Sequence, residues 1–319
     1  MTTKQLAQSS FSKEVSKGLK GILALIIVGS HLHYVTNFYL FDLLNKVATT
    51  SVALFLFISG YGLSVSYLRN PNLFLDTFFV KRFWKVLKPM LIATLFYLLL
   101  FYLDYGVWKQ NIIKNLVFKG YTPLPNSWFI FALLYYYTCF YVALRMAGKR
   151  PIVLVLTNFA LAIPYLVYTI GFSFGREWWV TILSFPTGVL YAFYRDQLFP
   201  IIRRPIVMVL FTLIVGVIVY SKVELLLLLT YVFIPLVVVA LLSYIRLPFG
   251  NCVLQFFGMI SYEIYLLHGI FINLFHGNHI DIILFNNYLY AIMVFVATIL
   301  FAYLFHHILY FNERRVEKA

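Results

Sequence analysis

Long apolar stretches dominate the chain, and short polar or basic segments separate them. A helix that crosses a membrane needs about 20 mostly apolar residues. Ten stretches fit that description: residues 19–36, 46–67, 87–104, 126–146, 151–171, 177–194, 205–221, 224–243, 251–275 and 286–310. The pattern therefore predicts an all-α fold, a polytopic bundle of about ten transmembrane helices.

The composition agrees with a membrane protein and excludes other classes. Only 11% of the residues are charged and 62% are hydrophobic, whereas roughly 25% of an ordinary soluble domain is charged. These values exclude a soluble enzyme, a disordered chain and a DNA-binding module. We therefore assign the net charge of +14 to basic loops beside anionic membrane lipids, with no nucleic-acid partner. The two cysteines form neither a disulfide framework nor a metal-ligand spacing, so we expect no metal.

The distribution of basic residues predicts the orientation. With the N-terminus in the cytoplasm, 19 of the 25 Lys and Arg residues fall on the inner side and six on the outer side. Basic residues favour the cytoplasmic side of membrane proteins. We therefore expect both termini to be cytoplasmic, in one integral-membrane domain over residues 1–319 with tails at 1–16 and 311–319. The plasma membrane is the expected location.

His31 is the first candidate for chemistry within the membrane. It follows Lys20 by 11 residues, which in a helix is roughly 16 Å, about half of a ~30 Å hydrocarbon core. An imidazole at that depth suits a general base, because it takes up and releases a proton near neutral pH. The alternative is a histidine that packs between helices. His33 faces away from His31, and we interpret it as structural or interfacial.

The ninth apolar stretch carries a second group of polar residues. Ser261, Tyr265 and His268 share one helical face, which is either functional or a means of binding helices together. Glu263 is the only acidic residue well inside a predicted span. It is a candidate to orient an imidazole, to pair with a buried cation, or to face a water-filled cavity without a catalytic part.

A basic cluster precedes the third apolar stretch. Lys81, Arg82, Lys85 and Lys88 lie within eight residues. Cations at that position suit the binding of phosphates, or they reflect ordinary inner-side topology with side chains that reach toward water.

Three further features have simpler structural interpretations. The glycines of Ser59–Gly62 allow helices to approach closely. His306 and His307 lie near the cytoplasmic end of the last stretch, where interfacial anchoring is expected. Walker A, Gly-rich dinucleotide, HExxH and GxSxG motifs are absent from the sequence, so nucleotide hydrolysis, hydride transfer and metalloproteolysis have no support.

Five segments share an order that points to a family. They are Lys17 to Leu25 continuing to His31, Ser51–Tyr61, Lys81–Pro89, Ser127–Phe129 and Ser261–His268. In this order they resemble the basic-x10-His, Phe-Phe-x-x-Ser-Gly-Phe, basic-to-Pro, Trp-Phe and Ser-Tyr-x-x-Tyr-Leu-x-His segments of acyltransferase family 3. Members of that family are membrane proteins that acylate surface polysaccharides and related acceptors.

The resemblance implies a reaction and a set of site residues. Cytoplasmic acyl-CoA, most often acetyl-CoA with succinyl-CoA as an alternative, donates an acyl group to a hydroxyl of a glycan or lipid-linked saccharide. His31 acts as general base or as a transient acyl carrier. The implied catalytic residues are His31, Ser261, Glu263, Tyr265 and His268. The implied donor-binding residues are Lys20, Lys81, Arg82, Lys85 and Lys88.

The sequence also departs from the family pattern. Lys20 stands where the family has Arg, so the charge remains but the bidentate grip of a guanidinium is lost. The extracytoplasmic domain of some members is not part of this sequence. We therefore expect acceptor transfer to be completed by the membrane domain or by a separate extracytoplasmic partner protein. Two rival interpretations stay open: a transporter or flippase for a lipid-linked sugar, and a catalytically silent scaffold.

Overall fold

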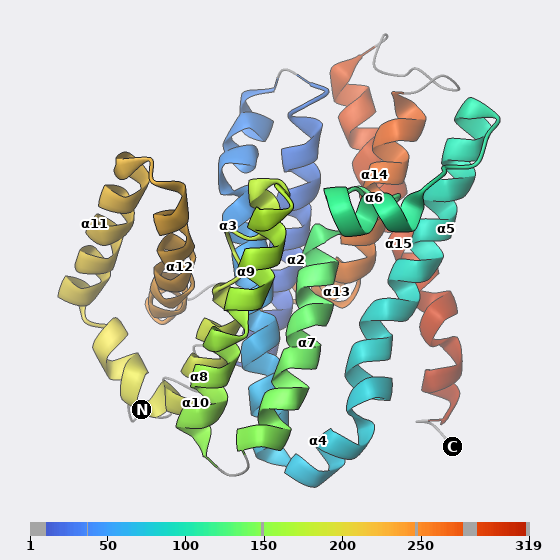
Figure 1. Ribbon diagram of the computed structural model, residues 1–319. Helices are drawn as coiled ribbons and strands as arrows, with labels where there is room; N and C mark the ends of the chain where they lie inside the picture. The colour runs from blue at the N-terminus through green and yellow to red at the C-terminus, as the bar shows by residue number, and fades with distance from the viewer. Residues whose placement is uncertain (1–10, 37, 148–149, 246–247, 277–285, 317–319) are drawn as a thin grey trace.

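A computed structural model describes residues 11–36, 38–147, 150–245, 248–276 and 286–316, and their elements are all helical (Figure 1). The α-helices are α2 (Lys13–Leu32), α3 (Tyr39–Arg69), α4 (Pro71–Phe78), α5 (Trp84–Tyr105), α6 (Ile112–Lys119), α7 (Trp128–Ala147), α8 (Pro151–Ala160), α9 (Ala162–Gly171), α10 (Ser184–Ile202), α11 (Pro205–Ser221), α12 (Leu227–Leu242), α13 (Cys252–Met259), α14 (Ser261–Phe275) and α15 (Asn287–Val316). Shorter turns are η1 (Phe79–Phe83), η2 (Arg176–Trp178) and η3 (Glu224–Leu226).

The described segments contain seven to nine candidate membrane-spanning helices, whereas the sequence predicted about ten. Seven helices are long and apolar enough by themselves. Two more candidates are bent pairs, α10 with α11 at 102° and α13 with α14 at 69°. The difference from the sequence prediction arises mainly at α10 and α11, because two apolar stretches separated by Arg203 and Arg204 form one sharply bent pair.

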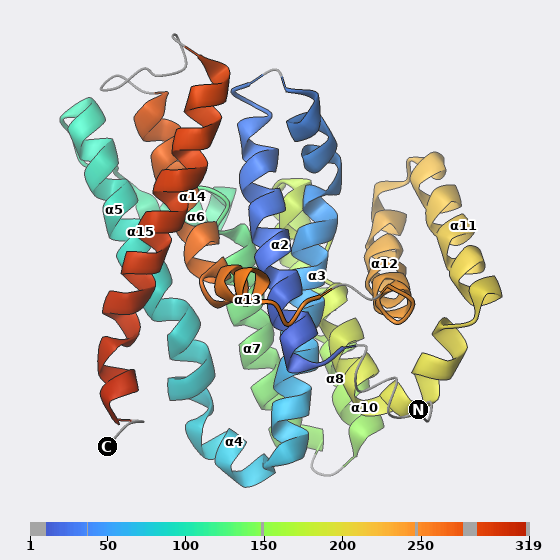
Figure 2. The ribbon, with the colours of Figure 1, turned by 180° about the vertical axis from the view of Figure 1, so that it is seen from behind.

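The helices stand side by side, and both described ends of the chain lie in the same half of the bundle. In both views α2 begins in the lower half and α15 ends at the lower end, on the outer side (Figures 1 and 2). We call this the lower end and the opposite one the upper end. The predicted tail over 311–319 is helical as far as Val316, while residues 1–10 and 317–319 lie outside the described part of the chain.

Helices α2, α3 and α14 form the centre that carries the site. α2 contacts both of the others. The long helix α3 also contacts α10, and α14 also contacts α5 and α15. The pair α11 and α12 stands to one side as a hairpin (Figures 1 and 2). Its outer helix exposes an almost wholly apolar surface, as expected of a helix in contact with lipid.

The segment between the predicted spans 46–67 and 87–104 is helical as well. Asn70 caps α4 by accepting a hydrogen bond from the Leu73 backbone N–H at 3.2 Å, and Pro71 occupies the first turn, where its missing donor costs nothing. The helix continues through the π-turn η1 into α5. The basic cluster therefore lies on a helix, and π-turns of this kind are frequent at functional sites.

Close packing of α3 on α10 depends on two facing glycines. A Cβ placed on Gly60 would lie 2.3 Å from the Phe185 carbonyl oxygen, and one on Gly188 would lie 2.2 Å from the Phe57 carbonyl oxygen. Real side chains do not tolerate such distances, so only glycine allows the two backbones to approach this closely. This confirms the packing interpretation for Gly60. By contrast, Gly62 has nothing within 4 Å of the corresponding position.

These two glycines give a matched stability test. We expect Gly60→Ala to destabilise the protein by about 1–3 kcal/mol, because the methyl group must push α3 and α10 apart. Gly62→Ala should leave stability unchanged or raise it by about 0.5–1 kcal/mol, because alanine favours a helix. Thermal unfolding in detergent measures both. Equal unfolding temperatures for the two variants would contradict the packing explanation.

Candidate active site

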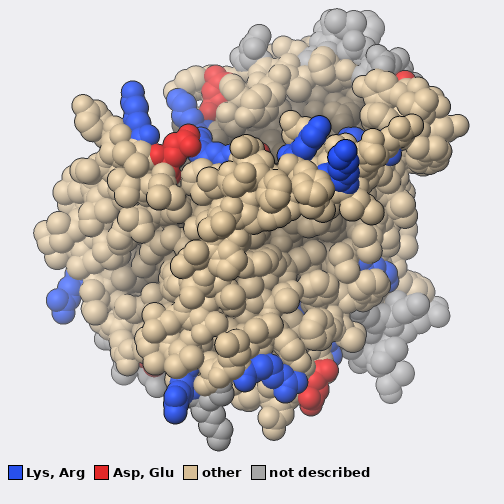
Figure 3. Space-filling model, viewed as in Figure 1, with Lys and Arg blue, Asp and Glu red and all other residues tan. Residues whose placement is uncertain are grey.

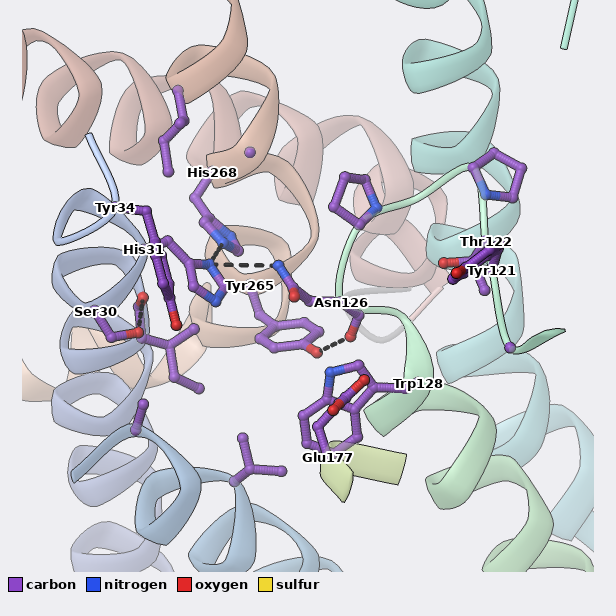
Figure 4. A pocket seen from close by; sticks show the side chains of 18 of the residues that line it. Ser30, His31, Tyr34, Tyr121, Thr122, Asn126, Trp128, Glu177, Tyr265 and His268 are labelled. Carbon is purple, nitrogen blue, oxygen red and sulfur yellow. Dashed lines mark hydrogen bonds between the residues drawn. The ribbon is translucent and has the colours of Figure 1, made fainter. Parts of the chain in front are cut away.

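A cavity of about 820 Å³ opens at the upper end of the bundle. It lies between the upper halves of α2, α3 and α14, the short helix α6 and the loop that precedes α7. Figure 3 shows the surface hollowed near this end, with side chains of both charges nearby. Figure 4 shows the polar side chains that point into the cavity. The segment at 105–126, which joins α5 to α7 and includes α6, therefore forms a wall of the cavity.

Two histidines from distant parts of the chain meet at the cavity wall. His31 in the last turn of α2 and His268 on α14 both line the cavity, and their rings stack with centroids 4.8 Å apart. His31 Nδ1 lies 2.6 Å from His268 Nε2 (Figure 4). His268 is buried, whereas His31 is partly accessible from the cavity. The structure thus joins two of the residues that the sequence singled out.

The hydrogen-bond partners of His268 determine which nitrogens carry protons. His268 Nδ1 lies 3.2 Å from the Ile264 carbonyl oxygen, and because a carbonyl only accepts, this nitrogen is the donor. A neutral His268 then has an unprotonated Nε2, which accepts a hydrogen bond from His31 Nδ1–H. His31 Nε2 is consequently left with a lone pair. This tautomer is the one that a general base at Nε2 requires.

Asn126 stands beside the two histidines, in the loop before α7. Its backbone carbonyl accepts a hydrogen bond from the Tyr265 hydroxyl, and its side-chain Nδ2 lies 3.5 Å from His31 Nδ1 (Figure 4). Because His31 Nδ1–H is the donor to His268, both of these nitrogens are donors, so the amide N–H groups of Asn126 are directed to other acceptors. The Asn126 backbone has φ +60°, a left-handed conformation that asparagine tolerates better than most residues. Sequence analysis missed this residue. The available signal was an asparagine in a turn directly before the Trp-Phe segment.

The remaining polar lining is mostly uncharged. Amide and hydroxyl side chains predominate, and aromatic rings cover much of the rest. The polar uncharged lining residues include Asn45, Thr49, Asn115, Thr122, Asn126 and Asn273. Trp128, Trp178, Tyr34 and Tyr121 supply aromatic surface, and Lys109 and Glu177 supply charge. Few convergent polar groups within a largely aromatic wall are typical of a small-molecule site.

Glu263 and Ser261 lie apart from the cavity. Glu263 is 2% exposed, and its Oε1 lies 2.7 Å from His306 Nδ1 on α15. Of the alternatives for Glu263, the structure thus shows an acid beside an imidazole, although the imidazole is not His31. Lys20 on α2 interacts electrostatically with Glu263. Ser261 Oγ donates to the Gly258 carbonyl oxygen at 3.2 Å.

Two histidines outside the cavity have their own partners. The expectation that His306 is an interfacial anchor is wrong, because the contact with Glu263 draws it into a partly buried pair between α14 and α15. At the upper end, His33 Nδ1 lies 2.5 Å from an Asp42 carboxylate oxygen on α3. That contact agrees with the structural interpretation of His33, which is not among the residues that line the cavity.

The cations of the basic cluster lie at the lower end, opposite the cavity. Lys81, Lys85 and Lys88 are exposed along η1 and α5. Arg82 instead turns toward α3, where its Nη2 donates to Ser66 Oγ at 2.6 Å. Lys20 is half-buried on a different helix, α2. The five predicted donor-binding residues therefore share the lower half of the bundle without forming one compact cluster.

Comparison with known proteins identifies the family. The family model described as an acyltransferase domain, acyltransferase family 3, matches residues 16–307. The chain belongs to acyltransferase family 3. No curated protein and no solved structure matches it. The acyltransferase match spans every residue of the cavity and of the basic cluster. Membership implies an acyl donor and an acceptor, and the apolar helices make this acyltransferase an integral membrane protein.

The Tyr265 hydroxyl should hold the Asn126 loop against α14. Tyr265→Phe removes its hydrogen bond to the Asn126 carbonyl but keeps the ring, which packs edge-on against Phe129 with centroids 5.3 Å apart. We expect a loss of about 1 kcal/mol of local stability, seen as faster hydrogen exchange of backbone amides in residues 120–127.

Tyr262→Phe is the matched control for this measurement. Tyr262 is on the same helix, and its hydroxyl donates to the Val86 carbonyl oxygen at 2.8 Å, on α5. This change should leave exchange in the 120–127 loop unaltered. Unchanged exchange in the Tyr265→Phe protein would show that the hydroxyl does not secure the loop.

Proposed function

We propose that this protein is a membrane O-acyltransferase that moves an acyl group, foremost acetyl, from cytoplasmic acyl-CoA to a hydroxyl of a cell-surface glycan or lipid-linked saccharide. The observation that carries this proposal is the His31 imidazole, bound to His268 at the wall of an open cavity. A base in that position has a defined proton-accepting nitrogen and room beside it for two substrates. The plasma membrane is the proposed location.

The reaction follows from the tautomer of His31. Its Nε2 accepts the proton of the acceptor hydroxyl while the hydroxyl oxygen attacks the thioester carbonyl carbon. A C–O bond forms, the tetrahedral intermediate collapses, and the C–S bond breaks. The proton then passes from the imidazolium to the departing thiolate, which leaves as free CoA thiol. In the alternative route, His31 carries the acyl group briefly before the acceptor takes it.

Neighbouring groups take separate parts in this reaction. The Asn126 amide is a side-chain donor beside His31, and we assign it to the oxyanion that develops on the thioester carbonyl. His268 is a positioning residue, since it orients the His31 ring. Tyr265 holds the Asn126 loop. Glu263 and Ser261 act at a distance by fixing α14, because their partners are His306 and the Gly258 carbonyl.

The donor is proposed to approach from the lower end. Basic residues gather there, as expected of the cytoplasmic side, and both termini then lie in the cytoplasm. Lys81, Lys85 and Lys88 would attract the phosphates of acyl-CoA as point charges, and Arg82, whose Nη2 is held by Ser66, would add its charge beside them. Lys20 lies on α2, eleven residues before His31, and we assign it to guide the acyl arm from the phosphates toward the base.

The cavity lining favours a neutral, hydroxyl-rich acceptor. Amide and hydroxyl side chains donate to and accept from hydroxyl groups, and a site built in this way rejects analogues that lack them. The cavity opens at the end opposite the basic cluster, so donor and acceptor enter from different sides of the membrane. A saccharide exported to the cell surface fits both properties, and a separate extracytoplasmic protein is a proposed partner for its delivery.

Replacement of His31 tests the proposed function directly. His31→Ala should lower acyl transfer at least about 100-fold, because general-base catalysis contributes 10²–10⁴. His33→Ala is the control, since His33 lies two residues away and bonds to Asp42 outside the cavity. The measurement is acyl-CoA-dependent release of CoA thiol by purified protein in detergent, with unfolding temperature as a check on folding.

The same assay separates the rival functions. A flippase moves a labelled lipid-linked sugar across vesicles without acyl-CoA and releases no thiol. A silent scaffold tolerates His31→Ala without consequence. Undiminished thiol release by a folded His31→Ala protein would refute the proposed role of this histidine.

The positioning role of His268 predicts a graded effect. Glutamine has an oxygen that can accept from His31 Nδ1–H, whereas leucine has no acceptor. We therefore expect His268→Gln to retain about tenfold more activity than His268→Leu, with the loss in kcat and little change in KM for acyl-CoA. Steady-state kinetics of the two variants provide the comparison. Equal activities, or a loss confined to KM, would contradict an orienting hydrogen bond.

A further inference from the structure

A second cavity of about 390 Å³ adjoins the first. Lys109, Pro123, Pro125 and Asn273 line both cavities. The loop that carries the two prolines therefore lies between the cavities and is shared as their common wall. The sequence analysis did not anticipate this second space, because it is formed where the upper end of α5 meets the loop before α7 and the end of α14.

Aromatic rings from one face of α5 line this second cavity. Tyr97, Phe101 and Tyr105 are spaced four residues apart, so they share a helical face. The rings of Phe101 and Tyr105 lie with centroids 4.6 Å apart. These side chains place aromatic surface beside the cavity that holds the two histidines.

Polar groups stand around the aromatic surface. Asp104 and His276 line the second cavity. Lys109 Nζ lies 5.4 Å from the centroid of the Phe101 ring. A sugar ring presents apolar C–H faces and equatorial hydroxyls together. Aromatic rings pack against such faces, while a carboxylate accepts hydrogen bonds from hydroxyls and an imidazole donates or accepts them.

We propose that the second cavity binds a further sugar residue of the acceptor, so that the preferred acceptor is at least a disaccharide. This inference rests on the proposed function. One sugar presents its hydroxyl to His31 in the first cavity, and the next extends past Pro123 and Pro125 onto Phe101 and Tyr105. The binding energy of this second sugar then contributes to acyl transfer to the sugar in the first cavity.

A donor nucleotide is the other occupant that aromatic rings could accommodate, and the charges argue against it. The Asp104 carboxylate repels phosphates, and Lys109 is the one Lys or Arg residue among those that line this cavity. The exposed cations suited to phosphates, Lys81, Lys85 and Lys88, lie at the opposite end of the bundle. The second cavity is therefore assigned to the acceptor.

The test compares acceptors of two lengths. The probes are methyl glycosides of glucose, galactose, mannose and N-acetylglucosamine, each beside its β-1,4-linked disaccharide. We expect the wild-type protein to favour a disaccharide, and Tyr105→Ala to raise KM for it about five- to tenfold, the value of one aromatic contact. KM for acyl-CoA and for the corresponding monosaccharide should not change. Tyr105 is 63% exposed, so its truncation leaves the core intact.

Tyr102→Ala is the matched control. Tyr102 lies on the same helix and lines neither cavity, and its ring stacks on that of Trp108 with centroids 4.6 Å apart. Truncation of the Tyr102 side chain should therefore not alter KM for any substrate. Equal kcat/KM for the two acceptor lengths would overturn the proposal. So would a Tyr105→Ala protein with unchanged disaccharide KM, or one in which KM for acyl-CoA rises, since the latter identifies a nucleotide site.

A binding titration keeps this inference separate from the proposed function. Isothermal titration of the same saccharides into the protein in detergent needs no turnover. Disaccharide binding that is weakened by Tyr105→Ala but not by Tyr102→Ala supports the second cavity even if no acyl transfer is detected. Failure of transfer with every probe counts against the proposed function, whereas failure of the disaccharide to bind more tightly than the monosaccharide counts against the inference.

Discussion

The contact between His31 and His268 is the interaction on which the rest of the site depends. It joins residues 237 positions apart in the sequence, from the last turn of α2 and the middle of α14. Because His268 Nδ1 is committed to the Ile264 carbonyl, the tautomer of both rings is determined by the helix backbone and not by a charged partner. Asn126 lies beside His31, and the Tyr265 hydroxyl, one turn before His268 on α14, holds the Asn126 backbone there. One helix therefore orients the base directly and supports the neighbouring loop.

The membrane explains why the chemistry is concentrated at a helix end and a cavity. Buried polar groups require partners, and irregular backbone at membrane depth is tolerated where it lines a cavity or is covered by protein. The loop before α7 and the short helix α6 satisfy this condition by forming the wall of the upper cavity. The basic cluster of Lys81, Arg82, Lys85 and Lys88 occupies the lower end, where long charged side chains can reach water.

Glu263 shows how far reasoning from residue type extends. An acidic residue within an apolar stretch indicates a specific partner, and the structure supplies one in His306. The choice among the histidines was not predictable, because it depends on the angle between α14 and α15 and on the 69° bend between α13 and α14. The spacing of Ser261, Tyr265 and His268 predicted a shared face, yet Tyr265 and His268 alone of these three line the cavity, since Ser261 lies lower on α14.

Sequence alone was sufficient for the helical membrane fold, the polar character of α2 and α14, and the family, because apolar length and local spacing are properties of contiguous residues. It also identified His31 and His268 as candidates. Tertiary structure decided their contact, the part taken by Asn126, the pairing of Glu263 with His306, the bent α10 and α11, and the second cavity beyond Pro123 and Pro125. Each of these requires two segments to meet at a particular distance and angle. Such geometry follows from how whole helices pack, as at the facing glycines Gly60 and Gly188, and not from the order of residues within one segment.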